Sequence, residues 1–273
     1  MQIAGRTIFI TGGGGGIGAG MAQAFAEKGG RIILADIDAG FAEAEAAKLP
    51  AGTDAMALPI DVTSRDSWAQ AKAAAEARFG PVDILCNNAG IASGFAPLID
   101  MDPADFDRLV AVNLTGVYNG IACFARAMVD RGAGHIVNTS SMNGLNPFGL
   151  FAAYSASKFG VLGLSDSLRQ ELAPHGVGVS TLFPGLTRSR MSESDTVGPG
   201  AMDPARLAQI RANMMEPIWL GRAVVRAVEQ DQPYIITHPE YRDDLARRFD
   251  TILAAFGEPA QPGYRTGASA TGR

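Results

Sequence analysis

The chain has 273 residues, 47% of them hydrophobic and 19% charged, which is enough for one large domain with a sizeable buried core. The net charge of -5 and the lack of a Lys/Arg-rich run argue against a nucleic-acid or anionic-membrane partner and favour a small-molecule partner. Two cysteines indicate no disulfide framework, so a cytoplasmic location is expected, and no apolar run reaches the roughly 20 residues of a membrane span.

Short apolar runs alternate with longer segments of helical period along the chain. Gly, Pro or Asp bounds each run, which is typical of buried parallel strands. The predicted strands are 7–11, 31–36, 55–61, 83–90, 135–140, 178–185 and 233–237, and the predicted helices are 16–29, 38–49, 64–79, 103–131, 153–173, 217–230 and 240–256. This alternation predicts an α/β fold with a single Rossmann-type, doubly wound parallel sheet of about seven strands and helices on both faces.

A glycine-rich turn, TGGGGGIG at residues 11–18, follows the first predicted strand and opens the first predicted helix. Glycines there let the backbone turn tightly and approach a pyrophosphate, to which the helix start presents amide donors. Asp36 ends the second strand about 20 residues later, where a carboxylate binds an adenosine ribose and repels a 2'-phosphate. No Arg or Lys lies within the turn or in the segment DIDAG at 36–40, so NAD is favoured over NADP. A turn-forming role is the alternative for Asp36.

Six further features follow the glycine turn. These are DV at 61–62, NNAG at 87–90, VNLTG around Asn113, IVNTSS ending at Ser141, YSASK at 154–158 and PG at 184–185. With the TGxxxGIG spacing of the turn, they occur in the order of the short-chain dehydrogenase/reductase family, and the chain resembles the branch of this family with TGxxxGIG and YxxxK motifs from about Thr7 to Ile236.

The resemblance implies a catalytic group of Asn113, Ser141, Tyr154 and Lys158. Together with the turn and Asp36, it indicates these cofactor-binding residues: Gly12, Gly16, Ile17, Gly18, Asp36, Asp61, Val62, Asn88, Ala89, Gly90, Tyr154, Lys158, Pro184, Gly185, Thr187 and Ser189. Family spacing selects Ser141 over Ser140, which strand alternation would turn to the other face. After PG the family has an aliphatic residue and then threonine, whereas this chain has LTRS, so the contact with the nicotinamide carboxamide is less closely defined.

Tyr154 and Lys158 lie about one helical turn apart and project from one face of the predicted helix. Hydride transfer at an alcohol carbon needs a group that moves the hydroxyl proton, and a free phenol is about three pKa units too basic to be anionic near pH 7. Lys158 acting across a bound ribose is not expected to supply that difference alone, so the positive charge of oxidised nicotinamide is expected to contribute. Tyr154 is then a reversible acid and base.

Two other residues of this group have predicted functions. Ser141 would donate a hydrogen bond to the reacting oxygen. By family analogy, Asn113 would hold a water that connects Lys158 to solvent. An ordinary amphipathic helix pair is the alternative for an isolated YxxxK, but the accompanying motifs disfavour it.

Residues 186–216 are expected to form a substrate lid, because substrate choice in this fold comes from loops beyond the carboxyl ends of the strands. The candidate pocket walls are Leu145, Phe148, Leu150 and Phe151. These favour a secondary alcohol or ketone with an apolar or aryl body, and the C-terminal segment resembles that of bacterial family members acting on bulky aryl alcohols. Arg188 and Arg190 are either partners of a substrate carboxylate or solvated.

The sequence therefore predicts an NAD-dependent short-chain alcohol dehydrogenase or ketone reductase. One alternative is an NADPH-dependent ketoreductase of the 3-oxoacyl type, which Asp36 disfavours; another is a non-catalytic NAD(H)-sensing protein, which the intact Ser-Tyr-Lys group disfavours. Residues 1–256 are expected to form a single domain and 257–273 an irregular tail. The resemblance implies a homodimer or homotetramer. No metal is predicted, because the three histidines lack Cys or carboxylate neighbours at ligand spacing.

Overall fold

The computed structural model describes residues 1–94, 96–189 and 209–257, and the chain forms two compact units. The first unit runs from Met1 to His238 and the second begins at Pro239. The second contains the short helix η6 (Pro239–Tyr241) and helix α10 (Arg242–Ala254). The single domain through residue 256 stays a prediction, and residues 258–273 of the expected tail lie outside the described residues.

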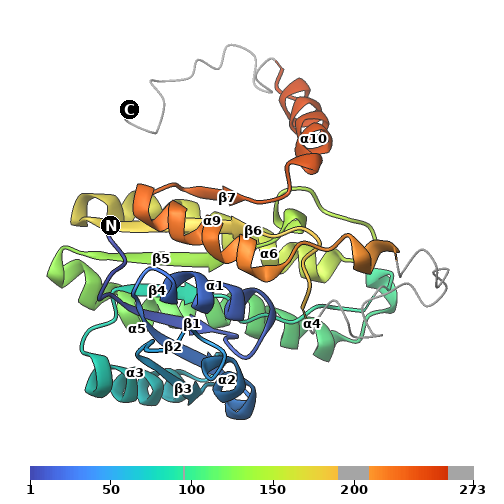
Figure 1. Cartoon of the computed structure of the whole chain (residues 1–273). Helices are drawn as coiled ribbons and strands as arrows, with labels where there is room; N and C mark the ends of the chain where they lie inside the picture. Colours follow the sequence, from blue (N-terminus) through green and yellow to red (C-terminus); the bar gives the residue numbers. More distant parts are fainter. Residues whose placement is uncertain (95, 190–208, 258–273) are drawn as a thin grey trace. The chain divides into compact units, whose positions relative to one another are not determined.

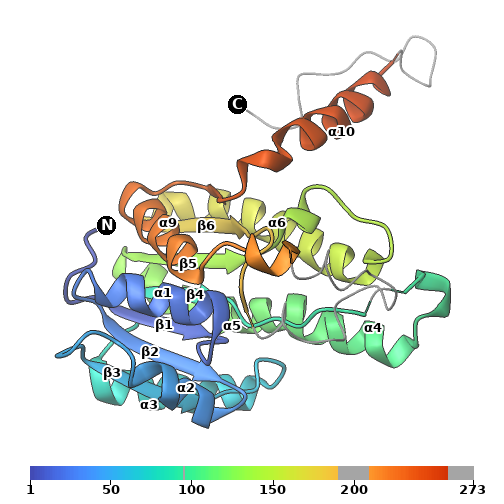
Figure 2. The same ribbon diagram turned by 45° about the vertical axis from the view of Figure 1, so that its right-hand side comes forward.

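In the described part of the first unit, seven parallel strands form one sheet (Figure 1). They are β1 (Thr7–Thr11), β2 (Arg31–Asp36), β3 (Ala55–Pro59), β4 (Ile84–Asn87), β5 (Gly134–Thr139), β6 (Val177–Phe183) and β7 (Tyr234–Ile236). Their order across the sheet is β3-β2-β1-β4-β5-β6-β7, and their arrows point the same way (Figure 2). The strand order reverses between β1 and β4, and the predicted doubly wound sheet is confirmed.

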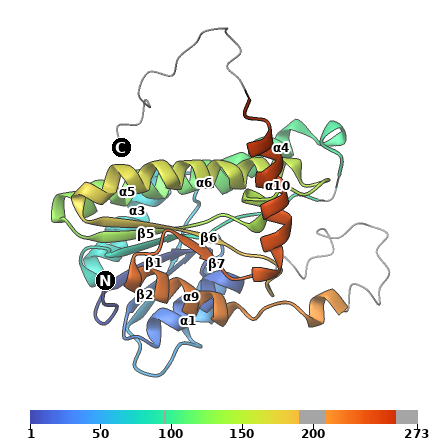
Figure 3. The same ribbon diagram turned by 90° about the horizontal axis from the view of Figure 1, so that it is seen from above.

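Helices cover both faces of this sheet. They are α1 (Gly16–Ala26), α2 (Ala39–Ala46), α3 (Arg65–Phe79), α4 (Pro103–Val110), α5 (Gly116–Arg131), α6 (Ala152–Leu172) and α9 (Pro217–Gln230). Buried side chains of α1, α2 and α9 form one core with Ile8 and Ile10 of β1, and those of α3, α5 and α6 form the other with Phe9. Figure 3 shows α1 and α9 on the face opposite α5 and α6. Alternation along each strand thus supplies both cores.

One predicted helix differs from the structure. The sequence predicts a continuous helix over 103–131, but a π-helical turn, η2 (Ala111–Thr115), separates α4 from α5. In this turn the Gly116 N–H bonds to the carbonyl of Ala111, five residues back. The predicted period of apolar residues does not distinguish this widened turn from an ordinary helix. None of the helices in the described ranges is long and apolar enough to cross a membrane.

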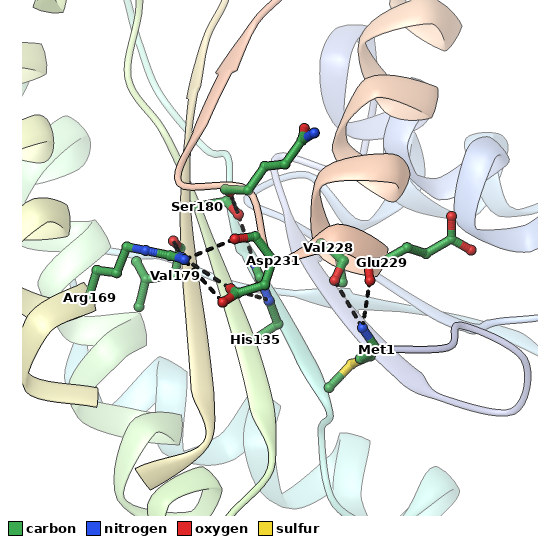
Figure 4. Close-up of polar contacts among 9 residues, drawn as sticks. Met1, His135, Arg169, Val179, Ser180, Val228, Glu229 and Asp231 are labelled. Carbon is green, nitrogen blue, oxygen red and sulfur yellow. Dashed lines mark hydrogen bonds and ion pairs between the residues drawn. The ribbon is translucent and has the colours of Figure 1, made fainter. Parts of the chain in front are cut away.

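A partly buried polar cluster lies at the amino-terminal end of β5 (Figure 4). The ring of His135 is buried, and its Nε2 lies 2.8 Å from the hydroxyl oxygen of Ser180. That hydroxyl donates to the carbonyl of Gln232 at 2.6 Å, so Nε2 carries a hydrogen and donates to Ser180. The guanidinium of Arg169 binds both carboxylate oxygens of Asp231 on the β7 side. Burial lowers the pKa of His135 to about 4, so the cluster holds a neutral imidazole.

We expect the free energy of unfolding to fall between pH 6.5 and pH 4 because of His135. The folded pKa of about 4 lies below the ordinary value of 6.5, so in this window the unfolded chain binds a proton that the folded chain does not. The contribution is fully present above pH 6.5 and is lost as the pH falls to about 4. The separation of the two pKa values corresponds to a loss of roughly 3 kcal/mol in the free energy of unfolding.

Urea unfolding at pH 7 and pH 4.5 measures this loss. His135→Gln keeps an amide donor for Ser180 and removes the titrating ring, so it should lose less stability between the two pH values than the wild-type chain. The same substitution at the exposed His175 is the control and should leave the pH dependence unchanged. An equal pH dependence in His135→Gln and wild type would contradict the assignment.

Candidate active site

The glycine turn follows β1 at the point where the strand order reverses. Its backbone is fastened to β2, because the Gly13 N–H donates to the Ala35 carbonyl at 3.1 Å and the Gly14 N–H donates to Oδ2 of Asp36 at 2.9 Å. The other carboxylate oxygen of Asp36 accepts from the Asp38 N–H at 3.2 Å. Asp36 is thus a turn former at the end of β2, and its buried carboxylate also lies directly against the glycine turn.

Side chains have no room at several positions of this turn. Gly12 has a φ of 64°, and a Cβ there would lie 3.0 Å from the Cα of Ala89. A Cβ on Gly18 would lie 2.2 Å from the carbonyl oxygen of Gly12. Helix α1 begins at this turn without a side-chain cap and without an acidic residue in its first turn, so its first N–H groups point to the turn with no side-chain acceptor of their own. This cradle of backbone donors fits a pyrophosphate.

Thr11 joins the glycine turn to the NNAG segment after β4. Its hydroxyl oxygen accepts from the N–H groups of Asn88 at 2.9 Å and Ala89 at 3.0 Å, and the hydroxyl donates to the Cys86 carbonyl at 3.3 Å. The side-chain amide of Asn88 donates to the Thr11 carbonyl at 3.1 Å. Sequence reasoning treated Thr11 only as the first residue of the glycine motif. The position of a hydroxyl residue at the end of the strand was the feature of the sequence that could have indicated this contact.

Three of the four predicted catalytic residues meet beyond the carboxyl end of β5. Ser141 follows this strand, and its side chain makes a hydrogen bond with Tyr154 of α6. The Nζ of Lys158 lies 5.7 Å from the centre of the Tyr154 ring and donates to the Thr139 carbonyl at 2.9 Å. The hydroxyl of Ser140 donates instead to the Lys158 backbone carbonyl at 2.8 Å. The arrangement therefore places Ser141, rather than Ser140, beside the phenol.

Burial acts on both ionisable groups of this site. It raises the pKa of the Tyr154 phenol, and the hydrogen bond with Ser141 offsets part of this rise. It lowers the pKa of the Lys158 ammonium to about 8. Lys158 is therefore mainly charged at pH 7 and loses its proton as the pH rises through about 8. The protein groups by themselves leave Tyr154 as a neutral phenol at pH 7.

Asn113 lies inside the π-helical turn η2 and is completely buried. Its Oδ1 accepts from the Ile91 N–H at 2.8 Å, while its Nδ2 donates to the Ile91 carbonyl at 2.9 Å and to the Ser157 hydroxyl at 3.2 Å. The amide thus fixes the segment after NNAG against α6. A Cβ on Gly90 would lie 3.2 Å from this Oδ1 and 3.4 Å from the Lys158 ammonium. Gly90 therefore lies against the side chains of both Asn113 and Lys158. A water held by Asn113 stays a prediction.

The DV motif lies at the start of the segment that leads to α3. Asp61 is exposed, and its Oδ1 accepts from the N–H and the hydroxyl of Thr63 at 2.9 and 2.7 Å. Val62 is buried, and its carbonyl accepts from the indole N–H of Trp68 at 3.0 Å. Their expected contact with an adenine stays a prediction.

The segment after PG reaches back to the glycine turn. A Cβ on Gly16 would lie 2.8 Å from the Cβ of Ser189, which places this predicted cofactor residue beside the turn, while Ile17 is half-buried. The Thr187 hydroxyl donates to the Gly185 carbonyl at 3.2 Å. Residues 190–208, which include most of the expected lid and Arg190, lie outside the described residues.

Arg188 lies at the start of the expected lid. Its Nε donates to the Glu216 carboxylate at 2.9 Å, so within the described residues it forms an ion pair. Thr187 and Met215 pair as a parallel bridge at the same place, which joins the two ends of the segment.

One of the candidate pocket walls, Phe151, packs against the ring of Tyr154. The ring of Phe151 meets that of Tyr154 edge-on, with centroids 6.1 Å apart. Phe148 and Leu150 of the same segment are exposed, and Leu150 has a φ of 67°, which is strained for a branched side chain. Among the described residues, no group of three or more His, Cys, Asp or Glu is placed to hold a metal ion.

This chain is similar to known dehydrogenases in sequence and in fold. A family model described as short chain dehydrogenase matches residues 6–198. A C alpha-dehydrogenase from Sphingobium sp. is 34% identical over 260 residues, which cover 91% of this chain and 85% of that protein.

The similar solved structures include complexes with NAD and with NADP. A short chain dehydrogenase/reductase from Burkholderia phymatum in complex with NAD is 28% identical, with a TM-score of 0.83 over 96% of this chain and 99% of that chain. A metagenomic short-chain oxidoreductase in complex with NADP is 32% identical, with a TM-score of 0.67 over 87% of this chain and 97% of that chain.

Thr11→Val is expected to lower the free energy of unfolding by about 2 kcal/mol, because the N–H groups of Asn88 and Ala89 lose the hydroxyl that they share. Thr11→Ser keeps that hydroxyl and serves as the matched control. Urea unfolding of the three proteins measures the difference. A valine variant as stable as the serine variant would show that the hydroxyl does not hold NNAG to the glycine turn.

Proposed function

Because the chain belongs to the short chain dehydrogenase family, we propose that it transfers a hydride between NAD and a secondary alcohol or ketone with an apolar or aryl body. Membership makes it an oxidoreductase with a nucleotide-binding Rossmann-type fold, acting on CH–OH groups. The observation that carries the proposal is the meeting of Ser141, Tyr154 and Lys158 beyond β5, in the same unit as the glycine cradle.

Asp36 supports NAD as the cofactor. Its buried carboxylate lies at the end of β2 and binds the Gly14 N–H, beside the cradle that would hold the pyrophosphate. A carboxylate there accepts hydrogen bonds from ribose hydroxyls and repels a 2'-phosphate. Similar solved structures hold either dinucleotide, so this preference depends on Asp36.

The remaining predicted cofactor residues would hold the dinucleotide along this edge of the sheet. Gly12, Gly16, Ile17 and Gly18 would face the pyrophosphate, Asp61 and Val62 the adenine, Asn88, Ala89 and Gly90 the ribose side, and Pro184, Gly185, Thr187 and Ser189 the nicotinamide. When bound, oxidised nicotinamide accepts the hydride and adds a positive charge near the phenol.

The protein groups move the proton. Tyr154, as phenolate, accepts the proton of the alcohol during oxidation, and as phenol it donates the proton to the carbonyl oxygen during reduction. Ser141 donates a hydrogen bond to the same oxygen and stabilises the charge that develops on it. Lys158, anchored by the Thr139 carbonyl, contributes a positive charge that favours the phenolate.

The apolar side chains on the segment before Tyr154 support the proposed substrate class. The edge-on ring of Phe151 and the exposed side chains of Phe148 and Leu150 lie on the segment that leads into α6. An apolar or aryl body next to the reacting carbon would cover these side chains, whereas a polyol would leave its hydroxyls without partners there. The Sphingobium relative is named a dehydrogenase, which supports the reaction class but not this substrate.

We also propose that the chain acts in the cytoplasm as a homodimer or homotetramer, as the resemblance implies, with residues 186–216 as its substrate lid.

Tyr154→Phe is expected to reduce turnover by at least about 100-fold while leaving NADH binding largely intact, because only the proton-transfer group is removed. Absorbance at 340 nm should be followed with NAD and NADP across polyols, short aliphatic alcohols and bulky aryl alcohols. Tyr118→Phe, at an exposed tyrosine of α5, is the matched control and should retain normal rates.

Tyrosine-dependent turnover of aryl alcohols would support both the reaction and the substrate class. Normal turnover in Tyr154→Phe would contradict the assigned acid and base. Binding of NADH without turnover of any alcohol would instead support the sensing protein.

Asp36→Ala should lower the ratio of kcat/KM with NAD to that with NADP at least about tenfold, because a 2'-phosphate is no longer repelled. Asp36→Asn keeps an acceptor for the Gly14 N–H and removes only the charge, so it should shift the ratio in the same direction with less effect on stability. If neither variant changes the ratio, Asp36 acts only as a turn former, and the NADPH-dependent alternative gains support.

A further inference from the structure

His238 lies buried directly behind the PG motif that follows β6. Its Nδ1 accepts a hydrogen bond from the Gly185 N–H at 3.0 Å, and its Nε2 lies 3.2 Å from the Leu186 carbonyl oxygen. The imidazole therefore spans two consecutive peptide groups, although 53 residues separate His238 from Gly185. The sequence alone assigned His238 no function, because the three histidines of the chain lack the spacing of metal ligands.

The two contacts determine which nitrogen of the His238 ring carries the hydrogen. A peptide N–H is always a donor, so the Nδ1 that faces Gly185 carries no hydrogen. The hydroxyl of Thr237 lies 2.8 Å from the same nitrogen, as a second donor. The neutral ring then has its hydrogen on Nε2, which donates to the Leu186 carbonyl. Each nitrogen of the imidazole thus matches the group that it faces.

Packing leaves Gly185 no freedom to move toward the ring. A Cβ on Gly185 would lie 2.6 Å from Cγ of His238, so only glycine fits there. On the Leu186 carbonyl, a second donor is the Met215 N–H at 3.0 Å, which comes from the far end of the expected lid. The peptide after Gly185 is thereby held between the imidazole and the 215 segment.

The same peptide segment adjoins the catalytic group. The Met142 N–H, next to Ser141, donates to the Pro184 carbonyl at 2.9 Å. Asp36, by contrast, lies at the end of β2, on the other side of the strand reversal. A dinucleotide with its adenosine ribose at Asp36 and its reactive ring near Tyr154 would therefore meet the 184–187 segment only at its nicotinamide end.

We propose that His238 is a positioning residue that holds the peptide groups of Gly185 and Leu186 for the nicotinamide end of the cofactor, an inference that rests on the proposed function. It touches neither substrate nor reacting atoms. Its loss should free the 184–187 segment, weaken binding of the nicotinamide half and leave the adenosine half unaffected.

Binding of NADH and of ADP-ribose separates this function from a general structural one, because ADP-ribose lacks the nicotinamide. In His238→Phe, which keeps an aromatic ring but has neither nitrogen, the Kd for NADH should rise about tenfold, while that for ADP-ribose should change less than about twofold. His238→Asn retains an acceptor near the Nδ1 position and should recover part of the NADH affinity. His175→Asn, at an exposed histidine, is the matched control.

The outcomes are distinct. Equal weakening of NADH and ADP-ribose binding in His238→Phe and His238→Asn, or no weakening in either, would overturn the inference. If His238→Phe does not fold, His238→Asn and His238→Gln, which each keep one of the two hydrogen bonds, should each raise the Kd for NADH about threefold with ADP-ribose binding unchanged. A wild-type chain that binds neither NADH nor NADPH would overturn the proposed function and this inference together, whereas NADH-linked turnover with unchanged binding in the variants would overturn this inference alone.

Discussion

The reversal of strand order between β1 and β4 is the constraint on which the site depends. The chains that leave these neighbouring strands turn in opposite directions, which opens a crevice at their carboxyl ends. The Thr11 hydroxyl holds the two segments together there by accepting from the N–H groups of Asn88 and Ala89. The glycine turn can approach NNAG only because its own residues lack side chains, as the 3.0 Å distance from a Cβ at Gly12 to Ala89 indicates. Steric exclusion and one buried hydroxyl thus form the cradle.

Desolvation then determines the chemistry of the site. Tyr154 and Lys158 share one environment, and burial shifts their pKa values in opposite directions, upward for the phenol and downward for the ammonium, because it disfavours the charged form of each. A buried site that raises the phenol pKa does not by itself produce a phenolate at pH 7. The proposed mechanism therefore couples proton transfer to the charge of the bound cofactor, so that Tyr154 is a base when oxidised cofactor is bound and an acid when reduced cofactor is bound. The Ser141 hydrogen bond acts in the same direction as that charge, since it favours the anion.

The two ends of the sheet use buried histidines for different purposes. At the amino-terminal end of β5, His135 joins β6 to the turn before β7 through Ser180, and its neutral ring contributes to stability. Beyond the carboxyl end of β6, His238 binds the backbone of the PG motif, where we propose that it positions a functional segment. In both cases a hydrogen bond across the chain determines which ring nitrogen carries the hydrogen. Ser180 and Gly185 both lie far in sequence from the histidine that each one contacts, so the functions of the two histidines depend on the fold.

The sequence alone determined the elements, their order and the local motifs. Alternating apolar runs predicted the strands and most helices, because burial on both faces selects such runs directly, and the glycine turn and the Tyr154–Lys158 spacing are local patterns that need no tertiary information. Only the tertiary structure decided the rest. The residues of the π-helical turn at Asn113 have the same apolar pattern as an ordinary α-helix, so the sequence does not reveal the turn. The pKa of Lys158 depends on burial by other segments. The hydrogen-bond partners of Thr11 and His238 lie far from them along the chain. Periodicity reports which face of an element is buried, but packing between distant segments decides which polar groups meet and how much water they keep.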